Sequence, residues 1–208
     1  MTDLIDVLWI GGGTGGGKST IAIALAERHG LQRYDYDWHD SRDHSERTRP
    51  DRHPTRAAFL EMSMDERWVL RTPETMARAQ LTEFTERFEM VLEDLAALDA
   101  PRVVAEGFGL LPELVRPVLA DPRHAVFLLP TTEARRRNYA RRAWVGIEGT
   151  SDHARAGRNK LDRDALLTDH ARRTATRLSL AVVELDGSEP LEDVITGVER
   201  RLGLAEAR

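Results

Sequence analysis

Five short segments of the chain are predicted to be β-strands, and all but the second are dominated by apolar residues. They cover residues 4–10, 32–37, 102–106, 125–129 and 181–185. The segment 125–129 is apolar at every position, which is typical of a strand covered on both faces. Helical segments separate the strands, and this alternation predicts an α/β domain with a parallel sheet and right-handed crossovers.

The spacing of apolar positions predicts one long helix. It begins after Thr72, a capping residue, with Pro73 at its first position. One face then carries residues at steps of three and four, namely Met76, Gln80, Phe84, Phe88, Val91, Leu95 and Leu98. Other helices are expected over residues 19–26, 55–62, 112–121, 162–180 and 188–202, and an arginine-rich one from residue 132.

The segment 38–54 has no apolar period and is crowded with His, Asp, Arg and Pro, so we expect a loop. Just before it, Asp35 and Asp37 lie two residues apart in the second predicted strand. Their carboxylates are therefore expected on one side of that strand, with Tyr34 and Tyr36 on the other.

Length and composition favour a single globular domain over residues 1–208, acting as a monomer or homodimer. No apolar run approaches the roughly 20 residues that cross a bilayer, so we expect no membrane partner. A net charge of -5 argues against nucleic-acid binding. The chain has no cysteine, which excludes disulfides and thiolate metal sites and makes the cytoplasm the expected location.

The most specific motif spans residues 12–19, which read G-G-T-G-G-G-K-S and fit the phosphate-binding pattern G-x-x-x-x-G-K-[ST]. Its glycines allow successive N–H groups to turn toward an anion. Lys18 is expected to reach the β- and γ-phosphates, and the Ser19 hydroxyl to ligate Mg²⁺. The predicted ATP-binding residues are Gly13, Thr14, Gly15, Gly16, Gly17, Lys18, Ser19 and Thr20.

Acidic residues follow two of the predicted strands, where α/β sheets gather their ligands. Asp35 and Asp37 end the second strand, and Glu106 ends the third before a glycine turn. A carboxylate there can take a proton from an attacking hydroxyl or hold Mg²⁺. The alternative is that these acids only cap the helices that follow.

An arginine cluster lies after the fourth strand. It consists of Arg135, Arg136, Arg137, Arg141 and Arg142. Arg137 and Arg141 are spaced i, i+4 and so lie on one helix face. We expect them to belong to a lid that stabilises charge on a transferred phosphoryl group. A solvated surface patch and an RNA contact are the alternatives.

Two other patterns are weaker. Residues 159–162 spell N-K-x-D, the guanine-reading motif of GTPases, but no buried strand precedes them, so Asp162 is expected to cap the following helix. His39, His44 and His53 fit no zinc spacing, and we expect them to line a substrate region or face solvent.

The order of these features resembles the nucleoside/nucleotide kinase-like group of P-loop kinases. That group includes uridine, gluconate and shikimate kinases and chloramphenicol phosphotransferases. The resemblance implies a P-loop NTPase fold with a five-stranded parallel sheet of order 2-3-1-4-5, a helical substrate-binding insertion over 38–100, and a lid over 132–162. It also implies that residues 186–188 lie near the nucleotide base.

The resemblance further implies roles for the acidic and basic residues. Asp37, or its neighbour Asp35, would be the base on an acceptor hydroxyl, and both would contact substrate. Glu106 would act on the metal or the substrate, and Arg137 and Arg141 would be lid residues.

The leading hypothesis is an ATP- and Mg²⁺-dependent kinase that phosphorylates a hydroxyl of a nucleoside, sugar or antibiotic-like metabolite. Lys18, Asp37, Arg137 and Arg141 would be catalytic, and Ser19 and Glu106 would hold the metal. The alternatives are a nucleoside-monophosphate kinase and a nucleotide-sensing ATPase or GTPase module.

Overall fold

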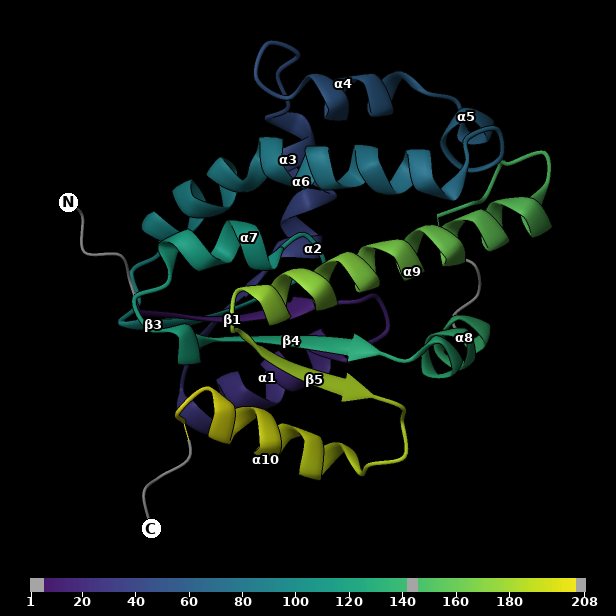
Figure 1. Ribbon diagram of the computed structural model, residues 1–208. Coiled ribbons are helices and arrows are strands. Elements are labelled where there is room, and N and C mark those ends of the chain that lie inside the picture. Colours follow the sequence, from purple (N-terminus) through teal and green to yellow (C-terminus); the bar gives the residue numbers. More distant parts are fainter. Residues whose placement is uncertain (1–5, 142–145, 205–208) are drawn as a thin grey trace.

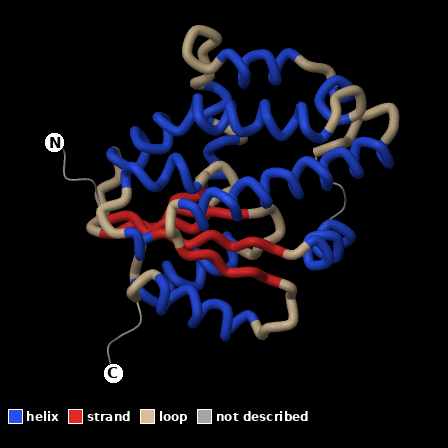
Figure 2. Tube along the Cα trace, viewed as in Figure 1, coloured by secondary structure: helices blue, strands red, loops and turns tan. Residues whose placement is uncertain are grey.

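A five-stranded parallel sheet forms the centre of the protein, in the order β2-β3-β1-β4-β5 (Figures 1 and 2). A computed structural model describes residues 6–141 and 146–204, without the side chains of 139–141. The strands are β1 (Asp6–Gly12), β2 (Gln32–Asp35), β3 (Arg102–Glu106), β4 (Ala125–Pro130) and β5 (Ala181–Leu185). The predicted fold class and strand order are therefore confirmed.

Side chains alternate along the strands between two apolar layers. In β1, Val7 and Trp9 enter one core cluster while Leu8 and Ile10 enter the other. In β4, Phe127 packs with the first cluster and Leu128 with the second, and both are fully buried. Burial on both faces explains why these strands read as continuous apolar runs.

Helices cover both faces of the sheet. In Figure 1, α1 and α10 lie below it, and α6, α7 and α9 lie above it. The bounds are α1 (Lys18–His29), α6 (Pro73–Ala96), α7 (Pro112–Val115), α8 (Thr132–Arg141), α9 (His153–Arg177) and α10 (Leu191–Arg201), with short 3-10 turns η1 (Arg116–Val118) and η2 (Pro122–His124). Within the described residues, no helix is long and apolar enough to cross a membrane.

Most of the predicted stripe of the long helix is confirmed, but Leu98 lies beyond α6, which ends at Ala96, and Gln80 is only partly buried. Thr72 caps α6 by accepting from the backbone N–H of Thr75 at 3.3 Å, and Pro73 is its first residue. Phe84, Phe88 and Val91 are buried in the core on the upper side of the sheet.

The expected loop at 38–54 is wrong, because part of this segment is helical. The insertion contains α2 (Tyr36–Asp40), α3 (Asp43–Glu46), α4 (Pro54–Glu61) and α5 (Met64–Trp68). In Figure 1, α4 and α5 lie above α6, whereas α2 lies below it, toward the sheet. α2 and α3 are only five and four residues long, and each buries a single residue, Tyr36 or His44. Helices this short show no apolar period in the sequence.

The predicted start of α9 is also wrong. The helix begins at His153, capped by the Asp152 carboxylate, which accepts from the backbone N–H of Arg155 at 2.9 Å. Asp162 lies inside the helix and does not cap it. The first turns of α9 are mostly polar, and their buried positions are Ala156 and Gly157, which carry a small side chain or none. No apolar period therefore marks the start of the helix.

Candidate active site

The phosphate loop joins β1 to α1 at the carboxyl edge of the sheet. Gly17 precedes the helix with φ 73° and ψ 14°, a left-handed conformation that L-residues rarely adopt. The backbone N–H of Gly13 donates to Leu128 O at 2.9 Å, which ties the loop to β4. Gly17 therefore has a backbone conformation that glycine allows at the start of α1.

Lys18 and Ser19 open α1, where the helix dipole favours an anion. Lys18 is buried, and its Nζ donates to Gly13 O across the loop at 3.1 Å. The Ser19 hydroxyl donates to Glu106 Oε2 at 3.1 Å. The two residues predicted to hold Mg²⁺ thus lie in direct contact, and a hydroxyl with a carboxylate suits that oxygen-seeking ion.

Glu106 is fully buried at the end of β3. Its second oxygen, Oε1, accepts from Arg33 Nη2 at 2.6 Å, and the same nitrogen donates to Asp35 Oδ2 at 2.5 Å. Burial raises the pKa of Glu106, while the hydrogen bond from Arg33 acts in the opposite direction. Arg33 therefore favours the ionised form that a metal ligand needs.

The expected placement of Asp35 and Asp37 on one side of a strand is wrong. β2 ends at Asp35, whose Oδ1 caps α2 by accepting from the Trp38 backbone N–H at 3.0 Å. Asp37 lies in the first turn of α2, is exposed, and accepts from the Phe108 backbone N–H at 3.1 Å. Asp35 is thus held by the cap and by Arg33, whereas Asp37 faces solvent at the sheet edge.

Phe108 links the candidate base to the phosphate loop. Its backbone holds Asp37, and its ring centroid lies 5.8 Å from Lys18 Nζ. The structure therefore brings Lys18, Ser19, Glu106 and Asp37 to one edge of the sheet.

The arginines of helix α8 lie in different surroundings. Arg135 is buried and donates to Thr168 Oγ1 at 2.8 Å, so it packs α8 against α9. Arg136 is exposed. Arg137 donates from Nη2 to the backbone oxygen of Asp186, which places it beside the turn after β5. The side chain of Arg141, and Arg142 altogether, lie outside the described part of the chain.

A pocket of about 220 Å³ opens beside the phosphate loop. Its walls include Gly16, Ile21, Asn138, Leu185, Gly187 and Val194. The apolar members of this set can face a flat aromatic ring, and the pocket adjoins residues 186 and 187. The resemblance to P-loop kinases implied a nucleotide base near this turn.

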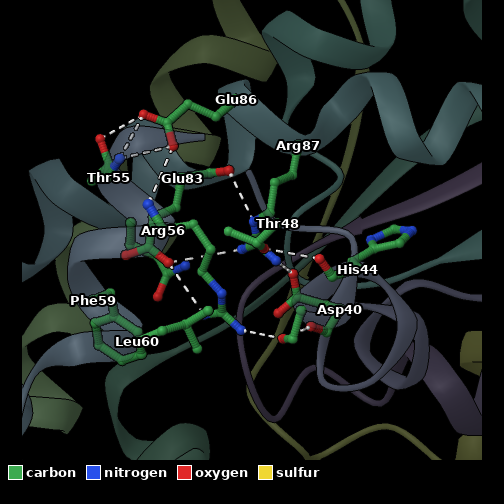
Figure 3. Close-up of polar contacts among 12 residues, drawn as sticks. Asp40, His44, Thr48, Thr55, Arg56, Phe59, Leu60, Glu83, Glu86 and Arg87 are labelled. Carbon is green, nitrogen blue, oxygen red and sulfur yellow. Dashed lines mark hydrogen bonds and ion pairs between the residues drawn. The ribbon is translucent and has the colours of Figure 1, made fainter. Parts of the chain in front are cut away.

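The helical insertion is held together by buried charges (Figure 3). Arg87 is fully buried and pairs with Asp40 of α2. Arg56 of α4 donates to Glu83 Oε2 at 3.3 Å and to Ser45 Oγ at 2.8 Å. These bonds connect α2, α3 and α4 to α6, on which the insertion is built.

The N-K-x-D sequence has a packing role in this fold. Asn159 Nδ2 donates to Trp68 O at 3.0 Å, and Lys160 Nζ lies 5.5 Å from the centroid of the Trp68 ring. The motif therefore fastens α9 to the end of α5, and within the described residues no strand directly precedes it.

Three residues of the site escaped the sequence analysis. Arg33 and Phe108 contact the predicted acids, and Asn138 Nδ2 donates to Gly15 O at 2.8 Å, which joins α8 to the phosphate loop. Only Phe108 carried a signal, because it sits in the glycine turn after Glu106.

No family model and no curated protein matches the chain, whereas several solved structures do. TT1252 from Thermus thermophilus matches with a TM-score of 0.54 and 18% identity, over 98% of this chain and 99% of that one. Shikimate kinase from Acinetobacter baumannii, in complex with shikimate, matches with a TM-score of 0.51 and 16% identity, over 97% and 95% of the two chains. Deoxyadenosine kinase from M. mycoides, with products bound, matches with a TM-score of 0.53 and 12% identity, over 96% and 100%.

At identities of 12–18%, these structural matches establish shared architecture alone. The strand order and the whole-chain matches confirm, at the level of fold, the resemblance to nucleoside/nucleotide kinase-like proteins. The chain has the P-loop kinase fold.

Proposed function

We propose that the protein is an ATP-dependent kinase that transfers the γ-phosphate to a hydroxyl of a small molecule. The observation that carries this proposal is the direct contact between Ser19 of the phosphate loop and Glu106 of β3, with Asp37 at the same sheet edge. The kinases among the matching solved structures support this proposal only by analogy of fold.

In this proposal the chain supplies binding and positioning. The loop N–H groups and Lys18 would hold the phosphates, and the pocket beside Gly16 and Gly187 would receive the nucleotide base. Mg²⁺, held by Ser19 and Glu106, would neutralise charge on the β- and γ-phosphates. The Phe108 N–H fixes one carboxylate oxygen of Asp37, which would accept the proton of the acceptor hydroxyl.

The insertion over 38–100 is the proposed acceptor-binding region, and residues 132–162, including Arg137 and Arg141, are the proposed lid. The described contacts weaken the alternative of a nucleoside-monophosphate kinase. Arg47, Arg49 and Arg52, which could grip an acceptor phosphate, pair with carboxylates. A kinase for a neutral hydroxyl therefore fits the insertion better.

The experiment measures transfer of labelled γ-phosphate from ATP to a panel of nucleosides, sugars, hydroxy acids and hydroxylated antibiotics. With the acceptor found, Asp37→Asn should lower kcat by about 10²- to 10⁴-fold, as loss of a general base does. Asp51→Asn is the matched control, because Asp51 is an exposed carboxylate of the insertion paired only locally with Arg49.

Full transfer by the Asp37→Asn variant would contradict the assigned base. Tight ATP binding with no acceptor, together with a nucleotide-dependent change in association state, would favour the nucleotide-sensing alternative. Strong inhibition by a bisubstrate dinucleotide would favour the monophosphate kinase.

A further inference from the structure

A cluster of two histidines and two aspartates lies outside the proposed phosphate site. His39 of α2, Asp43 and His44 of α3, and Asp94 of α6 each present one nitrogen or oxygen atom, and these atoms all lie within 4.8 Å of one another. The sequence pattern predicts these histidines and His53 in a substrate region or in solvent. His44 and His53 are buried and do not face solvent, and His44 joins His39 in this cluster.

The two imidazoles are oriented toward the cluster by packing. The His39 ring stacks on Tyr34 with a centroid distance of 4.6 Å and an interplanar angle of 11°. This places His39 Nδ1 at 3.0 Å from Asp43 Oδ2 and 4.0 Å from Asp94 Oδ2. His44 Nε2 lies 2.6 Å from Asp94 Oδ2, and Figure 3 shows its ring at the edge of the insertion network, directed away from Arg56.

The charges of the cluster suit a dication. Asp43 and Asp94 supply two carboxylates, and His39 and His44 supply two imidazole nitrogens. Arg47 Nη1 donates to the second oxygen of Asp94 at 2.7 Å, and its Nη2 pairs with Glu93. Tyr34 also donates to Asp94, at 2.8 Å. Outer partners of this kind commonly orient metal-binding carboxylates.

We propose that His39, Asp43, His44 and Asp94 form a site for one divalent transition-metal ion of the zinc type. Mixed imidazole and carboxylate ligands select such ions over Mg²⁺, which prefers oxygen alone. The ion would join α2 and α3 to α6, and α2 carries Asp37. The site is thus a structural metal centre within the proposed acceptor-binding insertion, separate from the proposed Mg²⁺ ligands Ser19 and Glu106.

The test uses the full chain without an affinity tag, stripped of metal with a chelator and titrated with ZnCl₂ by calorimetry. One Zn²⁺ should bind per chain, raise the melting temperature, and allow replacement by Co²⁺ with an absorption spectrum of tetrahedral nitrogen and oxygen ligation. His39→Ala should weaken binding at least about a hundredfold, because loss of an outer partner alone costs 10- to 100-fold.

His29→Ala is the matched control. His29 has the same side-chain exposure as His39, 27%, and also lies beside a carboxylate, Glu199, at 3.1 Å. Glu106→Gln serves as a second control, because it alters the proposed Mg²⁺ site and should leave Zn²⁺ affinity unchanged. Both comparisons measure Zn²⁺ affinity and need no kinase activity, so the metal site is tested independently of the proposed function.

Absence of saturable Zn²⁺ binding would overturn the proposal and leave the cluster as a set of hydrogen bonds between α2, α3 and α6. Equal affinities of the His39→Ala and His29→Ala variants would overturn it as well. Circular dichroism of the His39→Ala variant checks its fold, and His39 is only partly buried, so its removal leaves the core intact.

Discussion

Two glycines at opposite ends of α1 provide a matched test of the phosphate loop. Gly17 precedes the helix with φ 73°, and Gly30 follows it with φ 62°. A Cβ added at either position meets no atom within 4 Å. Alanine at these sites therefore introduces backbone strain without a steric clash.

The magnitude follows from the left-handed conformation, which costs an L-residue about 1–2 kcal/mol. Reduced freedom of the unfolded chain offsets about 0.4–1 kcal/mol of that cost. Gly30→Ala should thus lose about 1 kcal/mol of unfolding free energy, which lowers the melting temperature by roughly 2–4 °C in a chain of this size. Its affinity for Mg·ATP should not change.

Gly17→Ala should behave differently. The free loop can relieve strain by turning the peptide between Gly17 and Lys18, which moves the Lys18 N–H away from the phosphates. Binding must then restore the strained conformation at about 1–2 kcal/mol, and this lowers the affinity for Mg·ATP by roughly 5- to 30-fold. Urea denaturation and calorimetric titration of both variants measure the two quantities. Unchanged Mg·ATP affinity in Gly17→Ala would refute the view that this glycine shapes an anion site.

Three further predictions concern the pH response, the metal-side carboxylate and the core. Burial raises the pKa of Glu83 to about 7 from an ordinary 4.5, against the opposing effect of Arg56, so the fold loses stability as the pH rises from about 4.5 to 7 and loses no more above 7. Between pH 4.5 and 8 the unfolding free energy should fall by about 3 kcal/mol more in the unchanged chain than in Glu83→Gln, and equal slopes in urea titrations would contradict this. Arg33→Met removes the group that lowers the pKa of Glu106, so the acidic limb of the kcat/KM profile should shift to higher pH; an unshifted limb would argue against Glu106 as a metal ligand. Leu128→Ala, at a fully buried position of β4, should lose about 3 kcal/mol and lower the melting temperature by roughly 6–12 °C in calorimetric scans, and a loss under 1 kcal/mol would contradict the packing described.

The sheet could be predicted because four of its five strands are dominated by apolar residues and bounded by turn signals. Strand ends were less certain, as β2 shows. Asp35 looks like a strand residue in the alternating Tyr and Asp pattern, yet its carboxylate caps α2 and stops the strand. When the helix that follows is only about one turn long, the sequence does not distinguish its capping residue from the last residue of the strand.

The candidate site could be predicted where its residues belong to a local motif. Lys18 and Ser19 follow from the phosphate loop, and Glu106 from its strand end. Arg33 could not be assigned, because its partners Asp35 and Glu106 meet it only when β2 and β3 pair.

The His and Asp cluster was also beyond the reach of local patterns. His39, Asp43 and His44 are close in the chain, but Asp94 comes from the far end of α6. Spacing rules for zinc therefore missed a group that the packing of α6 against α2 and α3 creates.

The central claim is that residues 12–19 bind the phosphates of ATP with Mg²⁺. Calorimetric titration of the unchanged chain and of Lys18→Met with Mg·ATP tests it most directly. We predict one magnesium-dependent site per chain and a loss of affinity of at least about tenfold in Lys18→Met, since charge-assisted bonds are worth about 1.5–3 kcal/mol. Absence of binding by the unchanged chain, or equal binding by the variant, would contradict the account.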